Sequence, residues 1–350
     1  MKRSTRWLVS VAMFFGVAIE SSAHAAEPPC SPLAARVWRD VSGAVSKLFA
    51  KRMPAHPHVA IIEDDGSILA QGDIHLCGAA RINYKTHADD RQFLFVFAQG
   101  NGELAMGYNA YYNSLRNDVL GIGRAVEDRS GQCGSRGQLL GFANMNGHEK
   151  WTRFLFPVLD LWPLGVITHE LGHQWIAYLD APVRGMKLTT DRNTGLRSHW
   201  QPLVHTNASV MYGNEWKKLP LGSFISTSLP RGFSLLDKYL MGVAPASEVP
   251  PFFAIDARAQ KIWKHFAMPG NTARGKAVPI TIADIQSVYG PRVPDSAHAP
   301  RTYKAAFVLV VPKGQAASPD ALKVVEYFRR RIPERMKDET RGLFVIDTAL

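Results

Sequence analysis

Two histidines and a glutamate stand close together near the middle of the chain, at a spacing that can hold a metal ion. His169 and His173 are four residues apart, and Glu170 follows the first of them. On an α-helix, residues four apart share one face with Cβ atoms about 5–6 Å apart, so both imidazoles can reach one ion at Zn–N distances of roughly 2.0–2.1 Å. Glu170 lies one step further round the helix, beside the open side of that ion. The pattern therefore predicts a zinc site with an adjacent carboxylate.

The residues around this motif are those of a buried helix. Between Val166 and Trp175 none carries a charge apart from the motif itself, as a helix packed against a sheet requires. Pro163 stands where a first-turn proline is favoured, and Pro182 marks the far end. We therefore predict a helix from about residue 163 to residue 179, with both imidazoles on one face.

A third ligand has to come from another part of the chain. Catalytic zinc ions usually take three protein ligands and keep the fourth position for water. The short spacing, with a third histidine six residues after the second, is absent because Leu179 stands there, and no following Glu has a helical context. His199 is the leading candidate, since imidazole suits zinc and the segment is nearby in the chain. His205 and Asp237 remain alternatives.

A methionine and a tyrosine form a further candidate part of the site. The segment Ala208-Ser209-Val210-Met211-Tyr212-Gly213 resembles the methionine turn that lies beneath the metal in metzincins. This resemblance implies that Met211 forms an apolar floor under the ion and that Tyr212 donates a hydrogen bond to the oxyanion of the transition state. Ordinary packing in the core is the alternative role for both side chains.

Three ligands and a water molecule around zinc would make a hydrolytic site. Zinc lowers the pKa of its water toward about 7 and polarises a substrate carbonyl, while Glu170 takes the proton of the water and passes it to the leaving amine. The sequence thus predicts a zinc-dependent metallopeptidase, an endopeptidase that forms no covalent intermediate. A catalytically silent binding or scaffold protein of the cell envelope is the alternative, and a hydrolase of non-peptide bonds is a third hypothesis.

The N-terminus has the pattern of a cleaved export signal. Lys2, Arg3 and Arg6 form a basic region, residues 7–19 an apolar core, and Ala23-His24-Ala25 a cleavage site. The apolar core is shorter than the roughly 20 residues that a membrane-spanning helix needs. We expect cleavage after Ala25 and a secreted or periplasmic protein.

The chain is basic, with 41 Lys and Arg against 30 Asp and Glu and a net charge of +11. This charge fits either an anionic neighbour or ordinary solubility, and solubility is favoured because only residues 329–331 form a cationic cluster. We find no nucleic-acid motif and no later apolar stretch long enough to cross a bilayer. The expected partner is therefore a protein or peptide substrate, cell-wall peptides included, without nucleic acid or stable membrane insertion.

The chain has three cysteines, Cys30, Cys77 and Cys133. In an oxidising compartment an odd number allows at most one internal disulfide and leaves one thiol over. The sequence does not select the pair. It also leaves open whether a propeptide is present and which oligomeric state the protein adopts.

Hydrophobic periodicity and turn residues predict the remaining elements. Helices are expected at 31–54, from Ser234 through residue 241, and at 319–331; strands at 93–98, 138–144, 303–311 and 343–346; a hairpin at 59–63 and 67–71; loops at 106–123; and irregular loops with short strands at 183–232. The strand at 138–144 is the one that we expect to bind extended substrate by edge pairing. The expected regions are a leader at 1–25, a helix and hairpin region at 26–88, a catalytic domain at 89–250 and a C-terminal α/β region at 251–350.

With these residues in view, the chain resembles the zincin metallopeptidases, and within them a group of secreted bacterial zincins. The resembling segments are residues 116–123, His169-Glu170-Leu171-Gly172-His173, Ser198-His199-Trp200 and residues 233–242. The resemblance covers roughly residues 90 to 250. It implies an α+β zincin-like fold, in which a twisted mixed sheet and the motif helix form the upper wall of a cleft. It also implies Zn²⁺ as cofactor, His169 and His173 as ligands and Glu170 as general base.

Overall fold

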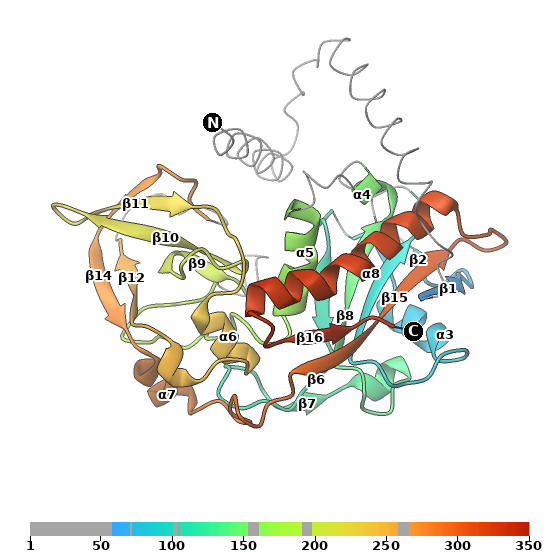
Figure 1. Ribbon diagram of the computed structural model, residues 1–350, viewed down its shortest axis with the longest axis horizontal. Coiled ribbons are helices and arrows are strands. Elements are labelled where there is room, and N and C mark those ends of the chain that lie inside the picture. The colour runs from blue at the N-terminus through green and yellow to red at the C-terminus, as the bar shows by residue number, and fades with distance from the viewer. Residues whose placement is uncertain are drawn as a thin grey trace, which may run out of the picture. The chain divides into compact units, whose positions relative to one another are not determined.

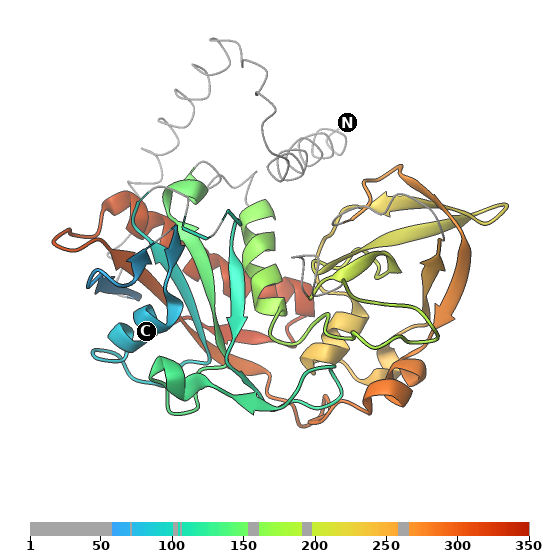
Figure 2. The same cartoon turned by 180° about the vertical axis from the view of Figure 1, so that it is seen from behind.

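The computed structural model of the chain describes residues 58–70, 72–100, 104–105, 107–152, 161–190, 198–257 and 266–349 (Figures 1 and 2). The described residues from 58 to 152 and from 163 onward form one compact unit. The predicted leader, the helix expected at 31–54 and Cys30 lie outside the described residues. Among the described residues, no helix is both long enough and apolar enough to cross a bilayer.

One six-stranded sheet takes its strands from distant parts of the chain. Its strands are β1 (Val59–Glu63), β4 (Phe93–Ala98), β5 (Tyr111–Ser114), β8 (Gly141–Gly147), β15 (Thr302–Val311) and β16 (Val345–Asp347). The order is β1-β15-β4-β8-β5, and β16 pairs with β15. All neighbours are parallel except β5, which is antiparallel to β8 at one edge of the sheet. Every residue of β4 and β8 is buried, as strands covered on both faces must be.

Helices cover the two faces of this sheet. Helix α8 (Pro319–Thr340) crosses one face (Figure 1), where the ring of Phe328 packs 5.3 Å from the ring of Phe97. On the other face, α3 (Leu76–Asn83) packs on the alternate residues of β4 and β15, which form one buried apolar cluster. A disulfide between Cys77 of α3 and Cys133 of the 3-10 helix η1 (Ser130–Cys133) fixes this face. The pairing that the sequence left open is therefore Cys77–Cys133.

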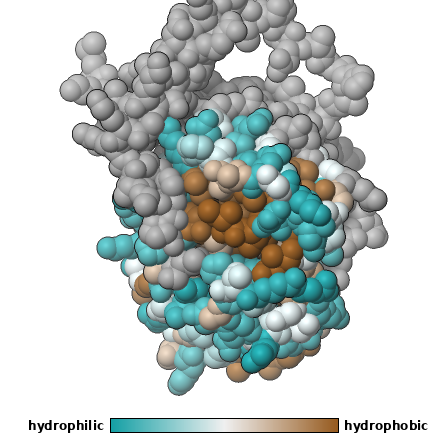
Figure 3. Space-filling view, turned by 90° about the vertical axis from the view of Figure 1, so that its right-hand side faces the viewer, coloured by the Kyte–Doolittle hydropathy of each residue, from teal (hydrophilic) through white to brown (hydrophobic). Residues whose placement is uncertain are grey.

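The outer edge of the sheet, opposite β5, is β1. Its residue Ile61 is 46% exposed, unlike the buried Ala60 and Ile62 beside it. Figure 3, in which this side of the molecule faces the viewer, shows a hydrophobic area bordered by hydrophilic residues.

A second six-stranded sheet holds the downstream half of the candidate site. Its strands are β9 (Trp200–His205), β10 (Tyr212–Leu219), β11 (Ser223–Ser228), β12 (Phe252–Asp256), β13 (Thr272–Arg274) and β14 (Lys276–Ile280). They follow the order β13-β11-β10-β9-β12-β14 around a small core that includes Trp216, Phe224 and Ile255. The remaining elements are β2 (Leu69–Ala70), β3 (Asp73–Ile74), β6 (Arg116–Asn117), β7 (Glu127–Asp128), α4 (Glu149–Thr152), α5 (Leu161–Gly172), α6 (Leu235–Met241), η3 (Ala246–Glu248) and α7 (Ile282–Tyr289).

Several predicted elements are present. The strands expected at 93–98 and 303–311 are β4 and β15, and the strand expected at 343–346 is β16, shifted by two residues at its start. The capping box predicted at Ser234 opens α6, because Ser234 Oγ accepts from Asp237 N at 3.1 Å and Asp237 Oδ2 accepts from Ser234 N at 2.7 Å. Helix α8 extends nine residues beyond its predicted end. The described residues thus form the expected α+β fold.

Other predictions are wrong because long-range pairing decides strand partners. The hairpin expected at 59–63 and 67–71 does not form: β1 pairs in parallel with β15, and β2 pairs with β3. The stretch predicted as loops at 106–123 contains β5 and β6. In the region 183–232, by contrast, the predicted short strands are present as β9, β10 and β11. The boundaries predicted at 88/89 and 250/251 do not separate domains, since β1, β4 and β15 come from all three predicted regions yet share one sheet.

Candidate metal centre

The motif helix is shorter than predicted. Helix α5 ends at Gly172, seven residues before the end predicted at Leu179, and a series of turns follows. His173 still keeps the helical register, because its backbone N–H lies 3.3 Å from the carbonyl oxygen of His169. A Cβ atom at Gly172 would lie 2.6 Å from Met211 Sδ. The glycine therefore allows the fully buried Met211 to pack directly against the end of the helix.

The structure brings His199 to the two histidines of the motif. His169 Nε2 lies 2.9 Å from His199 Nε2 and 3.2 Å from His173 Nε2. One nitrogen of each ring lies within 4.8 Å of those of the other two. Zinc with ligands at about 2.0–2.1 Å in tetrahedral geometry separates its ligand nitrogens by roughly 3.3 Å, so the arrangement fits this ion. Three imidazoles that present nitrogen atoms to one point form a donor set that zinc prefers.

Backbone contacts and burial prepare the imidazoles for this role. His169 Nδ1 lies 2.7 Å from the carbonyl oxygen of Val210, which accepts its hydrogen and makes Nε2 the unprotonated nitrogen that can ligate a metal. Burial, together with the neighbouring His169 and His199, holds the pKa of His173 well below its usual range. His173 is therefore neutral at physiological pH, which is the form that binds metals.

Glu170 and Tyr212 lie beside the three histidines. The Glu170 side chain is buried, and burial raises its pKa to about 8. The ring of Tyr212 stacks on that of His199 at a centroid distance of 4.6 Å and lies 5.0 Å from that of His169. Burial, followed by the charge of Glu170, raises the pKa of the Tyr212 phenol. Tyr212 therefore stays a protonated hydrogen-bond donor.

Asp237 and His205, the alternative third ligands, lie outside the histidine cluster. His205 Nδ1 accepts a hydrogen bond from Trp216 N at 2.9 Å, and its ring stacks on Phe253 at 4.8 Å. Asp237 is fully buried, and its Oδ1 accepts a hydrogen bond from Trp200 Nε1 at 2.8 Å. Neither residue belongs to the group of side chains that faces the candidate metal position.

Asp237 instead connects the two segments that carry the downstream site residues. Through Trp200 it holds the residue next to His199, and its carboxylate also accepts from the hydroxyl of Ser209. Ser209 Oγ accepts from Met211 N at 2.9 Å, and Trp200 N donates to Met211 O at 3.0 Å. The carboxylate therefore anchors both the start of β9 and the methionine turn. This role was not predicted from the sequence. The only signal for Asp237 there was its position in the capping box that opens α6.

Gln174, which the sequence analysis also missed, ties the end of the motif helix to β5. Its Oε1 accepts from Tyr112 Oη at 2.7 Å and from Ser114 Oγ at 3.0 Å. Its Nε2 donates to the carbonyl oxygen of Arg116 at 2.8 Å. The side chain is 1% exposed, so these bonds satisfy a buried amide. The sequence signal for Gln174 was a polar residue between His173 and the apolar residues that follow, which indicates a buried hydrogen-bonding role.

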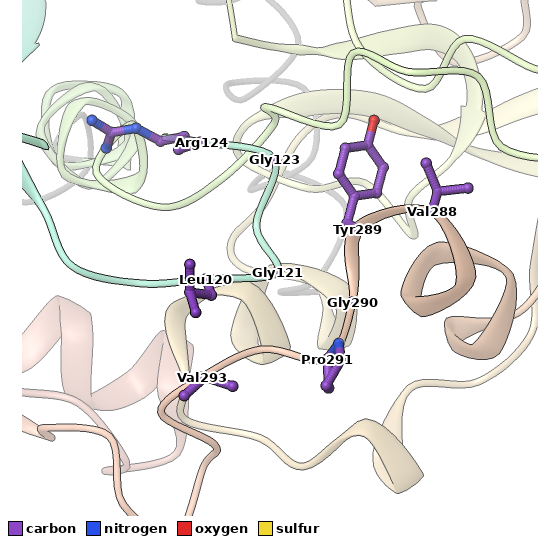
Figure 4. A pocket seen from close by; sticks show the side chains of 9 residues that line it. All are labelled: Leu120, Gly121, Gly123, Arg124, Val288, Tyr289, Gly290, Pro291 and Val293. Carbon is purple, nitrogen blue, oxygen red and sulfur yellow. The ribbon is translucent and has the colours of Figure 1, made fainter. Parts of the chain in front are cut away.

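A pocket of about 540 Å³ lies elsewhere, between the segment after β6 and the end of α7 (Figure 4). Its lining includes the apolar side chains of Leu120, Val288 and Val293, and none of the three histidines belongs to it. Arg124, also in the lining, donates to the carbonyl oxygen of Gln174 at 2.6 Å. The pocket therefore adjoins the support of the motif helix and is separate from the histidine cluster.

The comparisons with known proteins add no relative. No protein-family model matches the chain, and neither a curated protein nor a solved structure shows significant similarity to it. The functional reading therefore rests on the geometry of the site and on the chemistry of its side chains.

Proposed function

We propose that this protein is an exported zinc-dependent metallopeptidase with a zincin-like fold. The observation that carries the proposal is the convergence of His169, His173 and His199, from two segments separated in sequence, with Glu170 beside them. Chance proximity of three histidines would not explain why His169 is already oriented by the Val210 carbonyl. Such orientation is typical of metal ligands.

In this proposal the three histidines hold Zn²⁺, which when bound supplies a Lewis acid that activates water and polarises a carbonyl group. The positive charge of such an ion would favour the ionised form of Glu170, which accepts the proton of the attacking water and delivers it to the nitrogen of the leaving amine. The phenol of Tyr212 donates a hydrogen bond to the substrate carbonyl oxygen as negative charge develops on it. Glu170 is buried and Tyr212 is half-buried, which limits the access of bulk water to these transfers.

The strand that we propose for substrate binding is β5, which corrects the prediction for residues 138–144. That stretch corresponds to β8, which has β4 on one side and β5 on the other and so offers no free edge. β5 is the last strand on this side of the sheet, and an extended peptide can pair with such an edge. Gln174 links β5 to the end of the motif helix. A peptide on β5 would thus be aligned with the metal position.

Export is supported by the disulfide. Cys77 and Cys133 are paired, and structural disulfides persist mainly in oxidising compartments such as the periplasm and the extracellular space. This agrees with the predicted leader, which lies outside the described residues.

The experiment compares the protein with its Glu170→Gln variant. The change keeps the size of the side chain and all three histidines, and it removes the proton acceptor. We expect both proteins to bind one zinc ion, with peptide hydrolysis only in the unsubstituted protein. Zinc binding without cleavage of any member of a broad peptide library would instead favour a catalytically silent scaffold. Undiminished hydrolysis by Glu170→Gln would contradict the proposed mechanism.

A further inference from the structure

Two leucines at the end of the β10–β11 hairpin are exposed to solvent. The hairpin projects from the second sheet (Figures 1 and 2). Leu221, in its turn, is 100% exposed, and Leu219, at the end of β10, is 39% exposed. Single exposed leucines are common on protein surfaces, so the surroundings must decide whether these two have a role.

The turn itself is unfavourable for leucine. Ser223 N donates to the carbonyl oxygen of Pro220 at 3.2 Å, and the two central residues, Leu221 and Gly222, have φ angles of 59° and 67°. These values are those of a type I′ turn, in which Asn-Gly is strongly preferred. A leucine in the left-handed region is sterically disfavoured. The hairpin therefore carries a large apolar side chain where a polar residue would suit both the backbone and the solvent.

Cations surround the two leucines. Lys217 and Lys218 precede them on β10, and both residues are exposed. Arg274 of β13 lies opposite Ser223 of β11, and Lys276 follows two residues later. Both of these cations are also exposed.

The neighbours of two of these cations are an aromatic ring and a carboxylate. The ammonium group of Lys218 lies 4.7 Å from the centre of the Phe253 ring. Asp256 of β12 is the register partner of Lys276. Among the described residues, cations outnumber carboxylates at this end of the hairpin, which therefore carries positive charge. We call residues 217–222, with Arg274 and Lys276, the hairpin tip.

We propose that the hairpin tip docks the protein on a lipid bilayer with anionic headgroups. Leu219 and Leu221 enter the boundary between headgroups and acyl chains, and the cations around them contact lipid phosphates. Exposed apolar side chains combined with basic residues are what interfacial membrane binding uses. The hairpin needs no refolding for this, because its backbone hydrogen bonds are already made within the sheet.

A bilayer fits the hairpin tip better than other anionic partners do. An anionic polymer would attract the cations, but it offers no apolar phase to the leucines. A stable protein interface normally buries several hundred Å² on each side, which two leucines at the end of one hairpin do not provide. Only a lipid surface uses both the apolar and the cationic parts of this turn.

Docking in this way would set the height of the metal centre above the membrane. Tyr212, beside the three histidines, and Leu219, in the hairpin tip, are the two ends of β10. At about 3.3 Å per residue the strand separates them by roughly 23 Å. The proposal goes beyond peptide hydrolysis and does not require that the bound metal be active.

The experiment measures binding of the purified protein to sedimented vesicles of phosphatidylglycerol mixed with phosphatidylcholine, and to vesicles of phosphatidylcholine alone. The informative variant is Leu221→Asn, which removes the apolar side chain and creates the Asn-Gly sequence that a type I′ turn prefers. Loss of binding in this variant therefore does not reflect misfolding. The matched control is Leu120→Asn, since Leu120 is 53% exposed and lies by the pocket, away from the hairpin tip.

We expect binding to the anionic vesicles that weakens about tenfold or more in Leu221→Asn and is unchanged in Leu120→Asn. Lys217→Glu should also weaken it, and added salt should reduce binding of every variant. Absence of binding to anionic vesicles would overturn the proposal. So would salt-sensitive binding that Leu221→Asn leaves intact, because that result would show attraction by charge alone.

Discussion

Replacing Trp200 by phenylalanine should weaken zinc binding although Trp200 is not a ligand. Its indole N–H donates to the buried carboxylate of Asp237 at 2.8 Å, and its backbone leads directly to His199. A hydrogen bond to a charged group is worth about 1.5–3 kcal/mol, so the free energy of unfolding should fall by at least that amount. Because the change loosens the start of β9 and the methionine turn together, zinc affinity should fall about tenfold or more, as for other residues that support metal ligands.

The matched control is Trp151→Phe. Trp151 is equally buried, and its indole donates at 2.5 Å to the carbonyl oxygen of Met145 in β8, a strand of the first sheet. Both variants lose the same volume and one indole hydrogen bond, so both should be destabilised in urea unfolding. Competition with a chromogenic chelator then gives the zinc affinity of each folded variant. Equal zinc affinities for Trp200→Phe and Trp151→Phe would refute the view that Asp237 acts through Trp200 on the site.

Three further predictions follow from other parts of the structure. For peptide hydrolysis, Tyr212→Phe should lower kcat roughly a hundredfold with little change in KM, as expected for the loss of one hydrogen-bond donor to the oxyanion. An unchanged kcat would show that Tyr212 only packs beside the site. Replacing Cys77 and Cys133 by serine should lower the free energy of unfolding, measured by urea unfolding, by about 4 kcal/mol, because the disulfide closes a loop over a separation of 56 residues. Equal stability of the variant would exclude a structural disulfide. Burial raises the pKa of Glu339 to about 7, so the folded protein keeps a proton that the unfolded chain loses from about pH 4.5. This contribution to stability is complete below pH 4.5 and is lost as the pH rises through 7. Glu339→Gln should flatten that part of the stability profile, and an unaltered profile would contradict it.

The parts of the site that the sequence could predict are those with local signals. The metal motif lies within five residues, His169 to His173, so its spacing can be recognised from the sequence alone. The capping box of Ser234 and Asp237 is likewise a local pattern that predicts the start of a helix. His199 was selected because imidazole suits zinc, a chemical criterion that needs no knowledge of the fold. The structure places His199 beside His169 and His173.

The features that could not be predicted depend on contacts between distant residues. β1 has a hydrophobic sequence that would suit several partners, and its pairing with β15 joins residues about 250 positions apart. The edge strand could not be predicted for the same reason, because nothing in the sequence of β8 indicates that β5 pairs with it. Met211 packs from another segment against Gly172, the last residue of α5. In each case a tertiary contact overrides the local pattern.

The most direct test of the proposed metal centre is the zinc content of the purified protein and of two histidine variants. The account predicts one zinc ion per chain, lost in His199→Ala and retained in His205→Ala, because only the first imidazole faces His169 and His173. Full retention of zinc in His199→Ala, or its loss in His205→Ala alone, would contradict the three-histidine centre on which the proposed function depends.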